Sequence, residues 1–253
     1  MLNQYRSDVY SQNGEDGVLK EILKRLGIPG QEEGWCVEFG AWDGVHLRKT
    51  FRLIEHESWN VIYIEGDPEK YQALCAPATS FPAIEPKNSW VGDLPLAKSL
   101  DAILRGSALP LDYHVLSIDI DSYDLAVWAQ HRDYSPAIVI IEIESSIPPG
   151  IEQWHTEELP GNSFTSTLKV AKAKGYELVC HTGNMFFVRD DLVPLIGLDE
   201  LDRLYPERLF LSDWLIGSRI GRLRSNLNRY SSLLPPSLKK RLKEKALRLS
   251  RLS

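Results

Sequence analysis

The hydrophobic residues of this chain gather in short runs that are separated by longer amphipathic segments. Six runs are rich in β-branched and aromatic residues and are shorter than most helices, so we interpret them as strands. They cover residues 35–39, 61–65, 113–120, 137–143, 176–180 and 185–188. Strands that alternate with helical segments in this way are typical of a mostly parallel α/β sheet.

The amphipathic segments between these runs have the spacing of helices. Residues 16–26 place Val18, Ile22 and Leu26 on one face, and residues 96–104 carry a shorter apolar face. Residues 163–174 form a third predicted helix, which Gly175 ends.

The last two predicted strands are separated by a short turn that contains Thr182, Gly183 and Asn184, which predicts an antiparallel hairpin. The third strand of the sheet is poorly marked, because residues 75–91 contain three prolines. We therefore expect a Rossmann-like, mostly parallel sheet with helices on both faces and a C-terminal antiparallel hairpin.

The composition fits one globular domain with a small appendage. The chain has 253 residues, of which 43% are hydrophobic, enough for one sizeable core. The longest apolar run, residues 137–141, is far shorter than the roughly 20 residues that span a bilayer, and the polar start has no signal-peptide core. We expect a cytoplasmic protein. Its three cysteines form no Cys-x-x-Cys pair, and we expect them to be structural thiols.

The net charge of −6 is distributed very unevenly along the chain. Residues 218–253 contain 11 of the 29 lysines and arginines and one acid, a net charge of +10, which leaves −16 on the remainder. We predict an α/β domain over residues 1–217 and a basic tail over residues 218–253. The acidic body argues against a nucleic-acid-binding core, because phosphate recognition depends on basic surfaces.

The tail has the pattern of a basic amphipathic helix. Pro235 and Pro236 interrupt the chain, and Ser237 can cap a new helix whose leucines fall on one side. Such a helix can lie on an anionic membrane, which would hold the protein at the inner face of the membrane. Two alternatives stay open: a disordered solubilising tail, and a helix docked on the acidic body of its own or a partner chain. A homo-oligomer also stays open.

The first candidate site follows the first strand, where Glu38 precedes Gly40, Ala41 and Gly44. Glycine lets the backbone turn sharply and approach a ligand at the carboxyl edge of an α/β sheet, although such a turn can also be purely structural. The next strand ends in Glu65, 25 positions after Gly40. An acid at about this distance can bind ribose hydroxyls; the alternative is a solvated strand end.

A second candidate site is a group of acids at the ends of two later strands. Asp119 and Asp121 are two positions apart and therefore point to the same side, and Glu142 and Glu144 repeat the arrangement. Four converging acids would repel one another unless a cation, a proton or a substrate hydroxyl lay among them. Oxygen ligands suit Mg²⁺ or Mn²⁺, with Asp119, Asp121 and Glu142 as the candidate ligands. In the alternative, Asp121 and Glu144 cap helices or face water.

Three histidines, His46, His155 and His181, fall near the same predicted edge. Each can serve as a base, but each can equally be a packed or surface residue.

An ordered series of short motifs runs from about residue 10 to residue 188. The motifs are SQNGEDG (11–17), VEFGAWDG (37–44), IEGD (64–67), LSIDID (116–121), IPP (147–149), KGY (174–176) and NMFFV (184–188), with His46, Leu47 and Thr50 after the second. Together they resemble the FkbM-like methyltransferases, especially members associated with bacterial sugar and cell-surface glycan genes. In these enzymes the mostly parallel sheet ends in an antiparallel hairpin.

The resemblance implies an S-adenosylmethionine-dependent O-methyltransferase that acts on a sugar hydroxyl of a glycan or surface polysaccharide. Glu38, Gly40 and Gly44 would bind the methionine end of the cofactor and Glu65 the ribose, while Asp119 would lie beside the reacting centre. The full predicted set is Glu38, Gly40, Ala41, Gly44, Glu65, Gly66 and Asp67 for the cofactor and Asp119, Asp121 and Glu142 for catalysis. Asp119 would accept the proton or, in the metal-dependent alternative, help hold the ion that orients the hydroxyl.

The sequence departs from the family pattern beside the predicted pocket, at Arg48-Lys49, at Ser122-Tyr123 and at Glu144. These departures are the support for one rival, a non-catalytic methyltransferase-fold binding subunit. A second rival is an NAD(P)-dependent oxidoreductase, but the glycine turn lacks the G-x-G-x-x-G spacing that admits a pyrophosphate.

Overall fold

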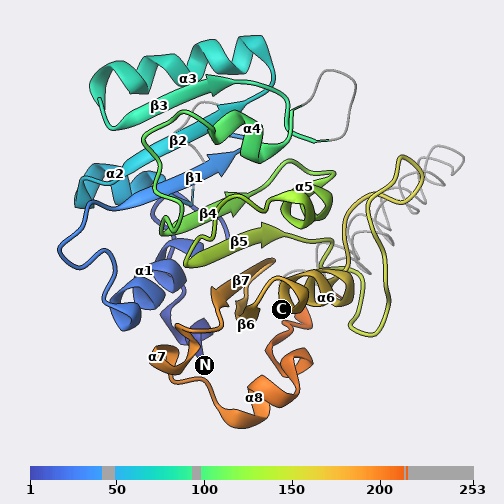
Figure 1. The fold of residues 1–253 in the computed structure, drawn as a ribbon. Helices are drawn as coiled ribbons and strands as arrows, with labels where there is room; N and C mark the ends of the chain where they lie inside the picture. The colour runs from blue at the N-terminus through green and yellow to red at the C-terminus, as the bar shows by residue number, and fades with distance from the viewer. Residues whose placement is uncertain (42–48, 93–97, 214, 216–253) are drawn as a thin grey trace, which may run out of the picture. The chain divides into compact units, whose positions relative to one another are not determined.

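The computed structural model describes residues 1–41, 49–92, 98–213 and 215 (Figure 1). The chain divides into two compact units, Met1–Leu211 and Ser212–Ser253. The fold described below is that of the first unit. The predicted boundary between residues 217 and 218 and the predicted tail helix lie outside the described residues.

The first unit is built on a seven-stranded mixed sheet with the order β3-β2-β1-β4-β5-β7-β6. The five strands from β3 to β5 are parallel, and β7 is antiparallel to both β5 and β6. The strands are β1 Trp35–Phe39, β2 Asn60–Glu65, β3 Ile84–Asn88, β4 Val115–Ile118, β5 Ile138–Glu142, β6 Tyr176–His181 and β7 Asn184–Arg189. This is the predicted Rossmann-like, mostly parallel sheet with its C-terminal antiparallel hairpin.

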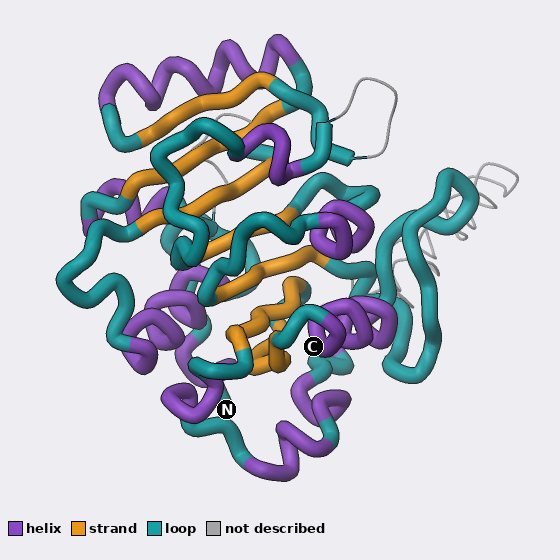
Figure 2. The backbone as a smooth tube through the Cα atoms, viewed as in Figure 1, coloured by secondary structure: helices purple, strands orange, loops and turns teal. Residues whose placement is uncertain are grey.

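Helices cover both faces of the sheet, as Figures 1 and 2 show. Side chains on one face of the strands, such as Cys36 and Val61, share an apolar core with α1 Glu15–Leu26, α2 Phe51–Glu57, α3 Pro68–Ser80 and α7 Val193–Ile196. The alternate side chains, such as Val37 and Ile62, pack with α4 Leu100–Leu104, α5 Asp124–Gln130 and α6 Phe164–Ala173. The remaining helices of the described unit are η1 Leu2–Tyr5, α8 Glu200–Leu204 and η2 Pro206–Leu209.

The third strand, which the sequence pattern did not locate, is β3 at the edge of the sheet. Its Pro86 lies opposite Tyr63 of β2, and no strand pairs with the other side of β3 in the described sheet. An edge strand tolerates proline because only one of its sides must donate ladder hydrogen bonds.

Two cysteines, Cys36 and Cys180, are buried within strands, as predicted for structural thiols. Burial raises the pKa of the Cys180 thiol to about 12, which keeps it protonated. Among the described helices, none is both long and apolar enough to cross a bilayer.

The topology positions the candidate site. Strands β1, β2, β4 and β5 are parallel, so their carboxyl ends lie at one edge of the sheet. That edge brings together Gly40, Glu65, Asp119 and Glu142, which follow or end these four strands.

Candidate active site

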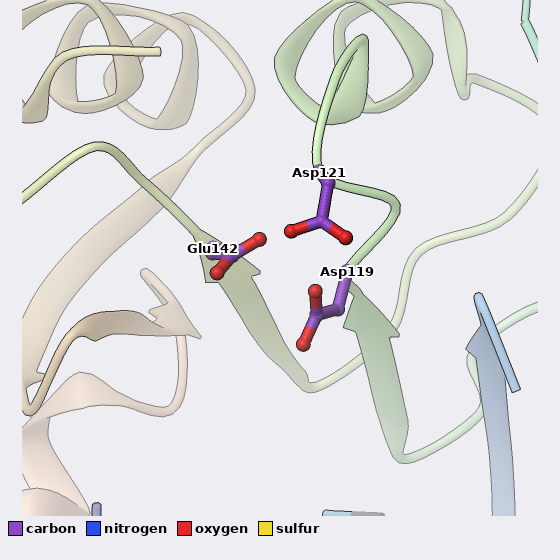
Figure 3. Close-up of side chains that lie close together, drawn as sticks. All are labelled: Asp119, Asp121 and Glu142. Carbon is purple, nitrogen blue, oxygen red and sulfur yellow. The ribbon is translucent and has the colours of Figure 1, made fainter. Parts of the chain in front are cut away.

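The three predicted catalytic acids lie together at this edge. Asp119 and Asp121 follow β4, Glu142 ends β5, and one carboxylate oxygen of each lies within 4.8 Å of the others. Figure 3 shows the three carboxyl groups directed toward one another. We call these three residues the acid cluster.

The turn after β4 depends on a fourth carboxylate, that of Asp124. It accepts hydrogen bonds from the backbone N–H of Ile120 at 2.8 Å and of Ser122 at 2.9 Å. Between them Asp121 has a φ of 58°, a left-handed conformation that aspartate tolerates better than most residues. Burial raises the pKa of Asp124 to about 6, although the two backbone hydrogen bonds oppose the shift. Asp124 therefore holds the turn that carries Asp121.

The carboxyl group of Glu142 has a strongly raised pKa. Burial, the charge of Asp119 and a hydrogen bond with Asp119 raise the pKa of Glu142 to about 9. The acid cluster therefore holds a proton at neutral pH.

Lys49 provides a cation beside the cluster, a contact that the sequence analysis did not predict. Its ammonium Nζ lies 2.5 Å from Asp119 Oδ2, and its side chain is only 5% exposed. The sequence marked Lys49 as a departure from the family pattern, but the two residues are 70 positions apart and nothing in the pattern paired them. The proton on the acid cluster and the ammonium of Lys49 thus both reduce the repulsion between the carboxylates that the sequence analysis predicted.

The fourth acid of the predicted group, Glu144, serves a turn. Its Oε1 accepts a hydrogen bond from the backbone N–H of Ser146 at 3.0 Å. Glu144 also lines a cavity of about 130 Å³ together with Asp121, Glu142 and Asn162. The acid cluster therefore has this small cavity on one side.

Glu38 organises the end of β1. Its side chain is fully buried and accepts hydrogen bonds from the Thr50 hydroxyl at 2.5 Å and from the backbone N–H groups of Thr50 at 3.3 Å and Lys49 at 3.4 Å. These bonds tie β1 to the start of α2, so Glu38 fixes the backbone that carries Lys49.

Gly40 is required where two backbones meet. It has a φ of 76°, and a Cβ added there would lie 1.9 Å from the carbonyl oxygen of Asp119. Ala41, which follows it, is buried. Gly44 and His46 lie outside the described residues. The glycine at position 40 therefore makes room for the β4 backbone.

The end of β2 has an acid and an exposed aromatic ring side by side. Glu65 is 6% exposed, and its Oε1 accepts the backbone N–H of Asp67 at 2.9 Å. Asp67 in turn caps α3, accepting from the N–H groups of Glu69 and Lys70. A Cβ on Gly66 would lie 2.4 Å from the indole of Trp90, which is 51% exposed. The sequence analysis did not single out Trp90.

The N-terminal segment also reaches the acids. A cavity of about 80 Å³ is lined by Ser11, Gln12, Asn13, Glu15, Lys49, Asp119, Glu142 and Asn184. Glu15 is buried and accepts hydrogen bonds from Thr182 at 2.9 Å and from Asn184 at 3.1 Å. Burial alone would raise the pKa of Glu15, but hydrogen bonds from Asn13, Asn184 and Thr182 lower it overall. These residues lie in the motifs SQNGEDG and NMFFV, but the sequence analysis did not predict that the two motifs meet.

Of the three candidate histidines, His155 and His181 lie in the described residues, and neither is an exposed base at the acid cluster. His181 is fully buried, and burial lowers its pKa to about 4. His155 packs edge-on against Tyr123, and its Nδ1 accepts the backbone N–H of Gly161 at 3.0 Å. Both rings are held by packing and backbone contacts.

The acid cluster fits a divalent metal ion in donor type but not in charge. Carboxylate oxygens suit Mg²⁺ or Mn²⁺. Asp119 Oδ2, however, already contacts the ammonium of Lys49, and a metal ion at Asp119 would lie close to that positive charge. The charge of Lys49 therefore disfavours a metal ion in the chemistry at Asp119.

A larger cavity lies away from this edge, between α6, β6 and α8. Its volume is about 510 Å³, and it is lined by residues such as Leu168, Tyr176 and Arg203. It includes none of the predicted site residues, so the acid cluster remains the candidate site on chemical grounds.

No protein-family model matches the chain, and no curated protein matches it. Solved structures do resemble it at low sequence identity. The CMeT domain of the citrinin polyketide synthase matches with a TM-score of 0.47 and 14% sequence identity. The match covers 72% of this chain and 55% of that structure. TrmK from M. capricolum, solved with S-adenosyl-homocysteine, matches with a TM-score of 0.45 and 12% sequence identity. The match covers 89% of this chain and 92% of the TrmK chain. The CurJ carbon methyltransferase matches with a TM-score of 0.48 and 10% sequence identity. The match covers 74% of this chain and 56% of the CurJ chain.

Proposed function

We propose that this protein is an S-adenosylmethionine-dependent O-methyltransferase and that its acceptor is a sugar hydroxyl of a glycan or cell-surface polysaccharide. The observation that carries the proposal is the convergence of Gly40, Glu65 and Asp119 at one edge of a methyltransferase-type sheet. The ordered motifs that resemble the FkbM-like family support the same activity and are the basis for the sugar acceptor.

The described residues suit the nucleoside part of the cofactor. Glu65 offers a carboxylate at the end of β2, where ribose hydroxyls can donate to it. The half-exposed indole of Trp90 lies against Gly66 and offers an aromatic surface for a purine. Glu38 acts indirectly, because the hydrogen bonds that it accepts from Lys49 and Thr50 hold the start of α2 beside the end of β1.

The acid cluster suits the acceptor. S-adenosylmethionine, when bound, supplies an electrophilic methyl carbon on a positively charged sulfur. Asp119 orients the acceptor hydroxyl by accepting its hydrogen bond, and it takes the proton as the oxygen bonds to the methyl carbon. The electron pair of the broken carbon–sulfur bond stays on sulfur, so charge and atoms balance. Asp121 and Glu142 flank Asp119 and can bind neighbouring hydroxyls.

A second candidate is a non-catalytic methyltransferase-fold protein. The contact between Lys49 and Asp119 favours it, because the ammonium occupies one oxygen of the proposed proton acceptor. The two candidates share the cofactor site and differ only in turnover.

Calorimetric titration with S-adenosylhomocysteine tests the cofactor site. We expect the wild type to bind it and Glu65→Ala to weaken binding at least tenfold, because the ribose acceptor is lost. The control is Glu85→Ala, which removes a half-exposed acid of β3 that pairs with Lys87, and it should bind as the wild type does. A wild type that does not bind S-adenosylhomocysteine contradicts the proposal.

Transfer of a labelled methyl group from S-adenosylmethionine to free sugars, nucleotide sugars and non-sugar phenols tests the reaction. We expect Asp119→Asn to lower the rate by about 100-fold or more, the size of general-base effects, and to change S-adenosylhomocysteine affinity by less than about threefold. Transfer to phenols alone would contradict the sugar acceptor. Cofactor binding without any transfer would favour the second candidate.

A further inference from the structure

We infer that Lys49 is the resident cation of the acid cluster: its ammonium positions Asp119 for the reaction proposed above and takes the place of a divalent metal ion. The inference rests on the proposed function for its catalytic part only. The charge arrangement stands on the geometry of the described residues.

The first support is the burial of the lysine. Lys49 is 4% exposed, and its Nζ lies 2.5 Å from Asp119 Oδ2. A lysine ammonium is rarely removed from water without a charged partner, because an unpaired buried charge costs several kcal/mol. The side chain therefore extends to Asp119 instead of reaching solvent.

The second support is the backbone that carries it. The N–H of Lys49 donates to Glu38 Oε1 at 3.4 Å, and Thr50 donates to Glu38 through both its N–H and its hydroxyl. Glu38 is fully buried in β1. Lys49 is thus held at a fixed point beside β4, and its length delivers a charge to one oxygen of Asp119.

The third support is the charge of the surroundings. The two small cavities beside the acid cluster are lined by Glu15, Asp119, Asp121, Asp124, Glu142 and Glu144, and among their described lining residues Lys49 is the one cation. A divalent ion on Asp119, Asp121 and Glu142 would share the Asp119 carboxylate with Lys49 and would be repelled by its ammonium. Removing the ammonium should therefore create a metal site from the same three acids.

Binding of Mn²⁺, followed by electron paramagnetic resonance, tests the charge arrangement without any need for activity. We expect weak binding to the wild type and at least tenfold tighter binding to Lys49→Met, which keeps the length of the side chain without its charge. Adding Asp119→Asn to that variant should remove the gain. Lys49→Arg should bind Mn²⁺ as weakly as the wild type, because it retains the cation. Lys174→Met is the matched control, since Lys174 is a half-buried lysine that donates to the carbonyl oxygen of His131.

The same proteins test the positioning role in the methyl-transfer assay. We expect a fall in kcat of at least tenfold in Lys49→Met with little change in KM for S-adenosylmethionine, and partial rescue in Lys49→Arg. Wild-type and Lys174→Met activity should not respond to EDTA.

The inference is overturned if the wild type binds Mn²⁺ as tightly as Lys49→Met, or if EDTA abolishes wild-type transfer. The EDTA measurement is made on the wild type alone, so it can overturn the inference even if Lys49→Met does not fold. Loss of transfer from every protein, with the Mn²⁺ pattern intact, would instead contradict the proposed function and leave the resident cation standing.

Discussion

Gly40 and Asp119 follow neighbouring parallel strands, and their backbones meet where the strands end. Gly40 has a φ of 76°, and its absent Cβ leaves the space taken by the carbonyl oxygen of Asp119. The sequence pattern left two explanations for this glycine, the approach of a ligand and a purely structural turn. In the structure the approaching group is the β4 backbone, so Gly40 sets the position of Asp119.

Replacing Gly40 by alanine should therefore disturb both stability and the acid cluster. We expect Gly40→Ala to lower the free energy of unfolding by about 3 kcal/mol or more, because a left-handed conformation and a clash with backbone add together. Urea denaturation measures this loss. Gly27→Ala is the control: Gly27 has a φ of 65° but no atom within 4 Å of an added Cβ, so only about 1 kcal/mol should be lost. Equal losses in the two variants would show that the clash with Asp119 is unimportant.

The positions of the acids could be predicted from the sequence, but the contact with Lys49 could not. Asp119 and Glu142 each follow a run of apolar residues, and parallel strands bring their carboxyl ends to one edge. Lys49 reaches Asp119 from a loop, across a distance that no periodicity encodes. The same holds for Asp121, whose direction depends on the turn that Asp124 holds by two backbone hydrogen bonds.

At the scale of elements, the strands buried on both faces were the easiest to predict. The central strands β1, β2, β4 and β5 consist almost entirely of apolar residues, and the predicted ranges match them to within two or three residues. The edge strand β3 has one buried residue, Ile84, and contains a proline, so its pattern resembles a loop. Of the predicted helix over residues 96–104, the first two residues lie outside the described part of the chain. The described helix begins at Leu100, where Ser99 caps it by accepting the N–H of Ala102.

His181 connects three elements at the hairpin end of the sheet. Its Nδ1 accepts the backbone N–H of Leu211 at 3.0 Å, and its Nε2 lies 2.9 Å from the Ser145 hydroxyl. Because Nδ1 is an acceptor, the ring proton belongs on Nε2, which donates to Ser145. Ser145 then donates to the carbonyl oxygen of Gly183 at 3.1 Å. A second proton on His181 would break the bond to Leu211.

This contact predicts a loss of stability in acid. Burial lowers the pKa of His181 to about 4, below the unfolded value of about 6.5, so the fold favours the neutral ring. The stabilisation is complete above pH 6.5 and is lost as the pH falls from there toward 4, about 2.5 kcal/mol of it by pH 4.5. Between pH 7.5 and pH 4.5, we expect the free energy of unfolding of the wild type to fall by about 2.5 kcal/mol more than that of His181→Gln. Urea denaturation at the two pH values measures both losses. The same pH dependence in both proteins would exclude His181 as the cause.

At the scale of the whole molecule, the dominant feature is the separation of charge along the sequence. Residues 218–253 carry a net charge of +10 and the remaining chain −16, a difference that the chain's overall −6 conceals. This asymmetry favours two kinds of contact. In self-association the basic tail would pair with an acidic protein surface, and in membrane binding it would pair with acidic lipid.

We predict that the tail binds anionic membranes. Each basic residue near such a surface contributes up to about 1 kcal/mol at physiological salt, and the leucines of residues 238–252 add apolar contact if the segment forms a helix there. Full-length protein should sediment with vesicles that contain phosphatidylserine, and binding should weaken as salt is added, because screening shortens the range of the attraction. Truncation after Leu234 should abolish binding, and vesicles of phosphatidylcholine alone should bind neither protein. If both proteins stay in the supernatant while the truncated one shows a smaller oligomer in light scattering, the tail instead contacts the acidic surface of a partner chain.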